Sequence, residues 1–215
     1  MLHSQLDHLA ITAPSLALGV EFVRDTLGAT PQPGGRHPRM GTHNCLLKLG
    51  GETYLEVIAP DPAAEAPPWP RWFRLDRPAA GPRLAAWIAR TNDIRAAAGS
   101  GAFGRIEPMD RGRLSWDITL PDQGDLVLDG IAPLLIQWRP GPHPAASLPD
   151  SGCALVALEG FHPQPAAVAE LLGAIGFRDA FQVSLPDPGQ PPHLIAHIQT
   201  PHGLRALSSA GAIHG

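Results

Sequence analysis

The chain has 215 residues, 44% of them hydrophobic and 17% charged, a composition that supports a folded core in one large domain or two small ones. Its formal net charge is −4 and its basic residues are scattered singly, so it has no electrostatic footprint for nucleic acid. The apolar runs are shorter than the roughly 20 residues that span a bilayer, and the first residues have no basic segment followed by an apolar one. We therefore expect a cytoplasmic protein that binds neither nucleic acid nor membranes.

The first sixty residues predict a β-α-β-β-β module. A strand is expected near residues 5–12, followed by a helix that starts at Pro14-Ser15 and ends at Gly28. A further strand and a Pro-Gly-Gly loop come next. Strands 42–49 and 53–59, joined by a Gly-Gly turn, complete the module.

His8 and Glu56 occupy matching mid-strand positions in the first and last strands of this module. Side chains alternate along a strand, so the neighbours of these two residues fall on the opposite face, where a helix can cover them. Those apolar neighbours are Leu9, Ile11, Leu55 and Val57. We therefore expect His8 and Glu56 to face the same side and to line a pocket.

The remaining chain repeats the same order of elements. Residues 61–82, rich in Pro, Ala, Trp and Arg, predict an irregular connection that covers the surface and can serve as a lid. Residues 83–140 predict a second β-α-β-β-β module, and residues 150–210 a third. The predicted class is α+β, with the first two modules paired edge to edge into a cupped sheet and the third packed beside it or against another chain.

Arg36, His37, His43 and Asn44 cluster before and within the third strand of the first module. A cation and an amide at the rim of a pocket can bind a carboxylate or phosphate. The alternative, which we favour, is that residues 42–44 hydrogen-bond the loop of residues 33–38 and fix its shape.

Several short strings resemble one known family. They are Leu6-Asp-His-Leu-Ala-Ile11, Pro33-Gly-Gly-Arg-His-Pro38, Gly41-Thr-His-Asn44, Tyr54-Leu-Glu-Val-Ile-Ala59 and Leu134-Leu-Ile-Gln-Trp138. Together with the module order, they resemble the glyoxalase-like branch of the vicinal oxygen chelate superfamily over nearly the whole chain. The resemblance implies cupped mixed sheets, a small-molecule ligand and, because many relatives dimerise, a homodimer. Its members include isomerases, epimerases, dioxygenases, resistance proteins and metal-free binding proteins, so the reaction stays open.

The resemblance also implies a set of metal ligands, drawn from the first and last strands of two paired modules. Here those positions hold His8, Glu56, Trp87 and Gln137, of which Trp87 cannot ligate and Gln137 is a weak ligand. The other three would leave open positions on Zn²⁺, Ni²⁺, Mn²⁺ or Fe²⁺, where a substrate with two adjacent oxygens could chelate. In a metal-dependent lyase, isomerase or dioxygenase-like enzyme, His8 and Glu56 would be the catalytic residues, with Glu56 taking a proton.

A metal-free binding or sequestration protein is the alternative. A His8–Glu56 pair would then satisfy its own polar groups, and the aromatic side chains of Trp87, Trp116 and Tyr54 would form the recognition surface. For Trp138, which alternates with Gln137, we favour a place in the core. The chain contains no phosphate loop and no glycine-rich dinucleotide motif, so no nucleotide cofactor is expected.

Overall fold

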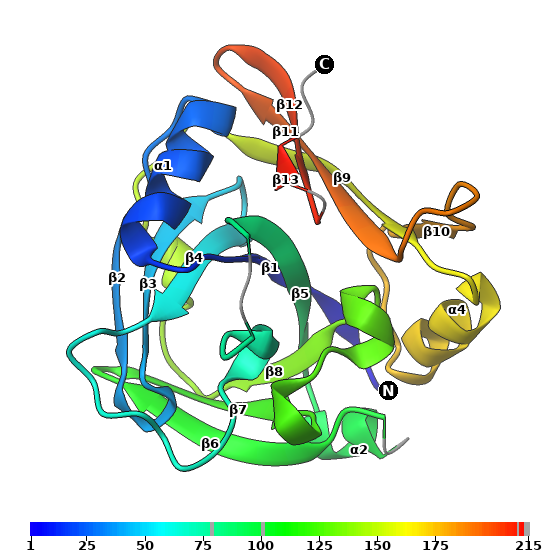
Figure 1. Cartoon of the computed structure of the whole chain (residues 1–215). Helices are drawn as coiled ribbons and strands as arrows, with labels where there is room; N and C mark the ends of the chain where they lie inside the picture. Colours follow the sequence, from blue (N-terminus) through cyan, green and yellow to red (C-terminus); the bar gives the residue numbers. More distant parts are fainter. Residues whose placement is uncertain (78–79, 100–101, 210, 213–215) are drawn as a thin grey trace.

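The computed structural model describes residues 1–77, 80–99, 102–209 and 211–212, whose strands form an eight-stranded and a five-stranded sheet (Figure 1). The larger sheet has the strand order β2-β3-β4-β1-β5-β8-β7-β6. The first four strands of this order come from the first predicted module and the last four from the second. They join where β1 and β5 pair antiparallel, as the edge-to-edge pairing predicts.

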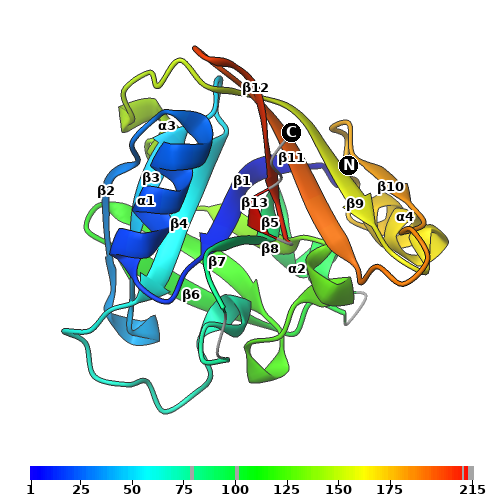
Figure 2. The same cartoon turned by 45° about the horizontal axis from the view of Figure 1, so that its top comes forward.

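The first module forms the first half of this sheet and also contains one long helix. Its strands are β1 (Ser4–Thr12), β2 (Gln32–His37), β3 (Thr42–Lys48) and β4 (Tyr54–Pro60). The helix α1 (Leu16–Leu27) begins where the Ser15 hydroxyl accepts a hydrogen bond from Leu18 N, and it ends at Gly28 in the left-handed conformation. Figure 2 shows α1 lying across β3 and β4, and the four apolar neighbours of His8 and Glu56 beneath this layer are fully buried.

The second half repeats the strand arrangement with a much shorter helix. Its strands are β5 (Arg83–Thr91), β6 (Arg105–Arg111), β7 (Leu114–Leu120) and β8 (Leu134–Trp138). The helix α2 (Ile94–Ala98) has 5 residues against 12 in α1, so it leaves part of the outer face of β5 uncovered. Short 3-10 turns occur at Pro38–Met40, Trp72–Arg74, Asp122–Gly124 and Val127–Gly130 (η1 to η4).

The third segment covers that outer face. After the short helix α3 (Pro144–Ser147) come β9 (Ala154–Phe161), α4 (Pro165–Ala174), β10 (Gln182–Ser184), β11 (His193–Thr200), β12 (Gly203–Ser208) and β13 (Gly211–Ala212). The elements occur in the expected order, but the strand order is β10-β9-β11-β12-β13. In the first two modules the first strand pairs with the last one, β1 with β4 and β5 with β8, whereas β9 lies between β10 and β11. This segment therefore differs in topology from the first two modules.

The third segment also holds the start of β1. Ser4 N donates to Gly176 O at 3.0 Å, and the Ser4 hydroxyl donates to Ile175 O at 2.7 Å. Leu6 N donates to the Asp179 carboxylate at 2.6 Å. A side chain at Gly176 would meet Leu2 O at 2.5 Å, so only glycine allows this close approach of the two backbones.

The architecture confirms the predicted α+β class and the cupped mixed sheet of repeated modules. The sheet curls so that its two edges approach each other: Arg39, after β2, pairs with Glu107 of β6. In the part of the chain that the structure describes, no helix is both long and apolar enough to cross a membrane.

Candidate functional site

A pocket lies inside the curl of the eight-stranded sheet, on the face opposite α1. Its open volume is about 30 Å³, room for a few water molecules. Polar side chains line one side and aromatic or aliphatic side chains the other. The lining residues are His8, His37, Asn44, Leu46, Tyr54, Glu56, Trp72, Phe73, Arg111, Trp116, Ile118, Ile136 and Trp138.

A β-bulge in β1 brings Asp7 to the side of His8. The pairing of β1 with β5 joins Leu6 to Ala89 and then His8 to Ile88, which leaves Asp7 as the extra residue. In a regular strand, consecutive side chains point to opposite faces, but a bulge redirects one of them. The Asp7 carboxylate consequently lies 2.6 Å from His8 Nδ1.

Asp7 is fully buried and accepts three side-chain hydrogen bonds. Besides His8, its partners are Trp138 Nε1 and His143 Nε2, each 2.9 Å from Oδ2. Burial alone raises the pKa of Asp7, but the hydrogen bonds from His143 and His8 hold it well below its usual range. Because this carboxylate is ionised and can only accept, the proton between the two groups belongs to His8 Nδ1.

His8 Nε2 is therefore the atom that can accept a proton inside the pocket. It lies 3.7 Å from Glu56 Oε2, and the His8 ring stacks on Tyr54 with the ring centroids 4.5 Å apart. Asn44 Nδ2 donates to Glu56 Oε1 at 2.5 Å and orients that carboxylate. Burial and the negative charges of Asp7 and Glu56 raise the pKa of the Tyr54 hydroxyl well above its usual range, so Tyr54 stays protonated.

Arg111 supplies the positive charge of the pocket. Its Nη1 donates to His37 Nε2 at 2.9 Å and to Asn44 Oδ1 at 3.0 Å. Burial and the charge of Arg111 lower the pKa of His37 to about 3, so His37 is neutral and accepts this bond. Among the described residues, Arg111 has no carboxylate partner within salt-bridge distance, and its remaining N–H groups are available to a ligand.

Two glycines make room for this arrangement. A Cβ on Gly34 would meet Asn44 Oδ1 at 2.2 Å, and one on Gly35 would meet Arg111 Cδ at 2.7 Å. Gly35 N also donates to Asn44 Oδ1 at 2.8 Å. The Pro-Gly-Gly sequence therefore allows Asn44 and Arg111 to pack against the backbone of β2, and Asn44 both lines the pocket and holds the loop.

The connecting segment covers the pocket with Trp72 and Phe73. Phe73 and the next residue, Arg74, have φ values of 56° and 57°, a region that non-glycine residues seldom occupy. Strained backbone of this kind often occurs at ligand clamps and switch regions. Trp72 Nε1 is buried and has no hydrogen-bond acceptor among the described residues. The connecting segment thus covers one side of the pocket and places the Trp72 Nε1 donor there.

The structure brings together six of the residues selected from the sequence. His8, His37, Glu56, Tyr54, Asn44 and Trp116 all line the pocket. The other four, discussed next, are Arg36, His43, Trp87 and Gln137.

Arg36 and His43 lie outside the pocket. Arg36 is 64% exposed and its Nε is 3.4 Å from Asp61 Oδ2. His43 alternates with Asn44 along β3 and is absent from the pocket wall. The cation near Asn44 is Arg111, from the other half of the sheet.

Trp87 corrects a prediction. It is fully buried on the outer face of β5, where it packs on Phe177 and Phe181 and its Nε1 donates to Ile131 O at 2.9 Å. In the register of the two central strands, Trp87 pairs with Leu9, and His8 pairs with Ile88. Trp87 therefore belongs to the core that the third segment covers and cannot stack on a ligand.

Gln137 and Trp138 exchange the places expected for them. Gln137 Oε1 accepts from Ile94 N at 2.9 Å, so its amide caps α2 on the outer face, away from His8 and Glu56. Trp138 lines the pocket and bonds Asp7. The ligand role of Gln137 is wrong because the side chains of β8 alternate in the opposite sense to the one expected. Trp138 packs against the core, as expected, but it does so from the pocket side.

Sequence reasoning missed the residues whose roles depend on distant contacts. They are Asp7, Trp72, Phe73, Arg111 and His143. The one local signal was the acidic residue directly before His8, which a bulge can turn to the same side.

The donor set does not fit a divalent metal held by three or four protein side chains. Among the described residues, no group of three or more His, Cys, Asp or Glu side chains could hold a metal ion. His8 Nε2 and Glu56 Oε2 are two candidate ligands, but β8 contributes Ile136 and Trp138 to the same space. No catalytic step is assigned to a metal.

Solved structures and a family model are similar to this chain. A hypothetical protein from Staphylococcus aureus is 13% identical over 86% of this chain and 86% of its own, with a TM-score of 0.58. Methylmalonyl-CoA epimerase from Mycobacterium tuberculosis is 20% identical over 66% of this chain and 91% of its own, with a TM-score of 0.41. No curated protein matches the chain. A family model described as a glyoxalase-like domain matches residues 6–176. The chain therefore belongs to the glyoxalase-like domain family of the vicinal oxygen chelate superfamily.

Proposed function

We propose that this protein binds a small oxygenated organic anion in the pocket of His8 and catalyses proton transfer at a carbon beside the carbonyl group, as an isomerase or a lyase does. The observation that carries this proposal is the Asp7–His8 pair, with Nδ1 and carboxylate 2.6 Å apart and Nε2 directed at Glu56. An imidazole oriented by a buried carboxylate is a recurrent general base.

In this mechanism His8 Nε2 takes the proton. Ionised Asp7 keeps the other ring proton on Nδ1 and stabilises the imidazolium that forms. Glu56, 3.7 Å from Nε2 and oriented by Asn44, is the second group able to carry the proton. An imidazole and a carboxylate side by side allow one group to remove a proton and the other to return one.

Arg111 and the tryptophan wall would position the substrate. The free N–H groups of Arg111 suit a carboxylate or a developing enolate oxygen, and the lid donor Trp72 Nε1 offers another hydrogen bond. Trp116 and Trp138, with ring centroids 5.3 Å apart, give the apolar part of the ligand a surface for stacking. Because the open volume is only about 30 Å³, the lid must move for a ligand to enter.

Hydrogen exchange in D₂O tests the proposal, because it detects proton removal even when the product is unidentified. The protein is incubated with a panel of α-keto acids, α-hydroxy acids and short diketones, and loss of the α-proton signal is followed by NMR. We expect exchange with at least one compound and a loss of about 100-fold or more in His8→Gln. His3→Gln, which changes an exposed histidine outside the pocket, is the matched control.

The same assay includes the metal expected from the resemblance. Each reaction is repeated with chelator and with added Zn²⁺, Ni²⁺, Mn²⁺ or Fe²⁺. We expect exchange that chelator leaves unchanged. Exchange that appears only with metal and disappears in His8→Ala would replace this proposal by the metal-dependent one.

A metal-free binding or sequestration protein is the second candidate. The narrow pocket and the hydrogen bonds that already satisfy Asp7 and one oxygen of Glu56 favour it. Quenching of tryptophan fluorescence by a ligand, without exchange of its α-proton, would favour this second candidate. The homodimer and the cytoplasmic location stay predictions.

A further inference from the structure

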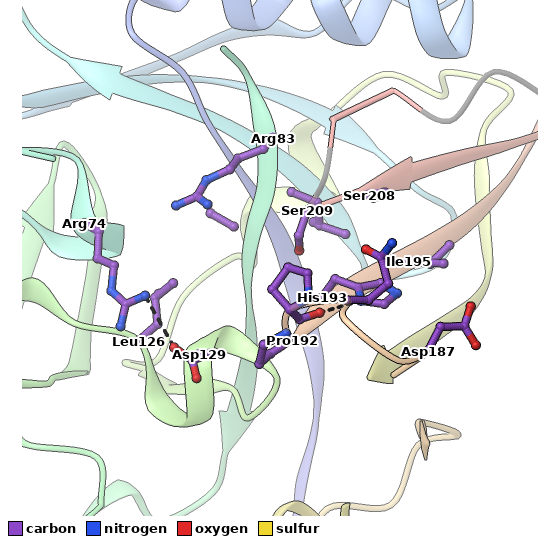
Figure 3. A pocket seen from close by; sticks show the side chains of 14 residues that line it. Arg74, Arg83, Leu126, Asp129, Asp187, Pro192, His193, Ile195, Ser208 and Ser209 are labelled. Carbon is purple, nitrogen blue, oxygen red and sulfur yellow. Dashed lines mark hydrogen bonds and ion pairs between the residues drawn. The ribbon is translucent and has the colours of Figure 1, made fainter. Parts of the chain in front are cut away.

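A second, larger cavity lies between the two sheets and shares no lining residue with the pocket of His8. This interlayer cleft has a volume of about 420 Å³, within the range of small-molecule sites. Its walls come from β5, from η2 and η4 of the large sheet's connections, and from β11, β12 and the loop before β11 (Figure 3). The five-stranded sheet thus creates a space that neither of the first two modules contains.

Arg83 is the unpaired charge of the interlayer cleft. Its Nε is buried and has no hydrogen-bond acceptor in the part of the chain that the structure describes, and no ion pair connects its guanidinium to any carboxylate there. Figure 3 shows the Arg83 side chain extending from β5 toward the side on which Arg74 and Leu126 lie. Arg83 is half-buried, and a buried N–H without an acceptor is costly; an anion bound from outside the chain would supply that acceptor.

The other charges of the cleft are accounted for. Arg74 pairs with Asp125 at 3.0 Å and with Asp129 at 3.6 Å, so its charge is compensated. Asp187 is exposed and lies at the opposite end of the cleft from Arg74. Burial and the positive charge of Arg74 lower the pKa of Arg83, which agrees with a cation that no carboxylate neutralises.

The rest of the wall is suited to an apolar body. Leu84, Leu126, Pro192 and Ile195 line the cleft, and the His193 ring is stacked on Phe161 with the ring centroids 4.5 Å apart. The His193 Nδ1 is 2.9 Å from Pro191 O, which fixes the ring at this edge. A cation beside an apolar wall selects a ligand that has an anionic group and a hydrocarbon or aromatic body.

We propose that the interlayer cleft is a second binding site, for an amphipathic organic anion whose carboxylate or sulfonate is held by Arg83. The site is independent of the proton-transfer pocket, because none of its lining residues is shared with that pocket. Its ligand need not be a substrate.

Anilinonaphthalene sulfonate is the probe, and its neutral counterpart N-phenylnaphthylamine is the comparison. We expect saturable fluorescence of the sulfonate with the native protein and affinity about 10- to 100-fold weaker in Arg83→Gln, the loss expected for a charge-assisted hydrogen bond. Binding of the neutral compound should not change. Arg95→Gln, which changes an exposed arginine on α2, should bind both probes as the native protein does.

Competition on the native protein gives a second readout that needs no variant. Octanoate should displace the sulfonate, and octanol should displace it far less. Equal competition by the two, unchanged sulfonate affinity in Arg83→Gln, or the absence of saturable binding would overturn the proposal. Melting curves of each variant exclude loss of fold as the cause of lost binding.

Discussion

The two halves of the eight-stranded sheet share one strand order but contribute different chemistry. The first half brings the hydrogen-bonding side chains to the pocket, with His8, Asn44 and Glu56 on adjacent or nearby strands. The second half brings Ile118, Ile136 and two tryptophans, and a single charge, Arg111. Repetition of a module therefore preserved the shape of the sheet and not the composition of its face.

This contrast makes the pocket one-sided. Proton-carrying groups on one wall face an apolar wall that excludes water. Arg111, from the second half, donates a hydrogen bond to Asn44 of the first half. Low local dielectric strengthens the hydrogen bonds among these groups. A single hydrogen-bond network thus joins the two halves. Substitution of its residues one at a time should show how much each contributes to stability and ligand binding.

Loss of the carboxylate beneath His8 should have the largest effect. Asp7→Ala leaves the donors of His8, Trp138 and His143 without their acceptor, which we expect to cost about 3–5 kcal/mol in the free energy of unfolding. Urea unfolding measures it. Asp25→Ala, whose side chain is 63% exposed, should cost less than about 0.5 kcal/mol; equal losses in the two variants would mean that the buried network contributes nothing special.

Protonation of His37 should produce the next largest effect. Its pKa is about 3 in the folded protein against an ordinary value of 6.5, so between these pH values the unfolded chain binds a proton that the folded one does not. This contribution to the free energy of unfolding is therefore fully present above pH 6.5. As the pH is lowered below 6.5, the free energy of unfolding decreases by up to about 1.4 kcal/mol per pH unit.

The comparison of the native protein with His37→Gln isolates this contribution. Between pH 6.5 and 4.5, the variant should lose about 2–3 kcal/mol less than the native protein. Urea unfolding at several pH values gives both curves. Parallel curves would show that the histidine beside Arg111 is not the group that resists protonation.

Crowding Asn44 should have an intermediate effect. Gly34→Ala places a methyl group 2.2 Å from Asn44 Oδ1, which must move and release Glu56 or Arg111. We expect a loss of about 2 kcal/mol and weaker ligand binding in the pocket. Gly173→Ala, in α4 with nothing within 4 Å of the new Cβ, is the control and should be neutral or slightly stabilising. Binding unaffected by Gly34→Ala would argue that Asn44 does not organise the site.

The smallest effect is expected on the outer face of β8. Gln137→Ala removes the acceptor for Ile94 N at the start of α2, at a cost of about 1 kcal/mol. Proton exchange and metal response should be those of the native protein, because this amide does not reach the pocket. A change in proton exchange or in the response to metal would show that Gln137 contributes to the site.

The fold could be predicted from the sequence because its signals are local. Ser15 and Gly28 delimit α1, the Gly50-Gly51 turn joins β3 to β4, and alternation places Leu9 and Val57 under the helix. These rules need only nearby residues. The side shared by His8 and Glu56 followed from the same alternation.

The rest of the site depends on which face of its strand each residue occupies and on contacts between residues far apart in the sequence. Trp87 and Ile88 differ by one position, and a shift of one residue exchanges the faces of a strand. The bulge at Asp7 breaks the alternation that predicted its face. Arg111 reaches His37 only because the sheet curls, across 74 positions of sequence. No local pattern contains that information.

The contacts that hold β1 determine where this chain can be cut. A fragment ending after β8 would lose the acceptors of Ser4 N and Leu6 N, and with them His143, on the strand that carries His8. The smallest piece able to keep its pocket therefore extends at least to Asp179, a few residues past the family match that ends at residue 176. Repeat boundaries visible in the sequence are thus poor guides for truncation, and shortened versions of this protein should be designed around the anchor of its first strand.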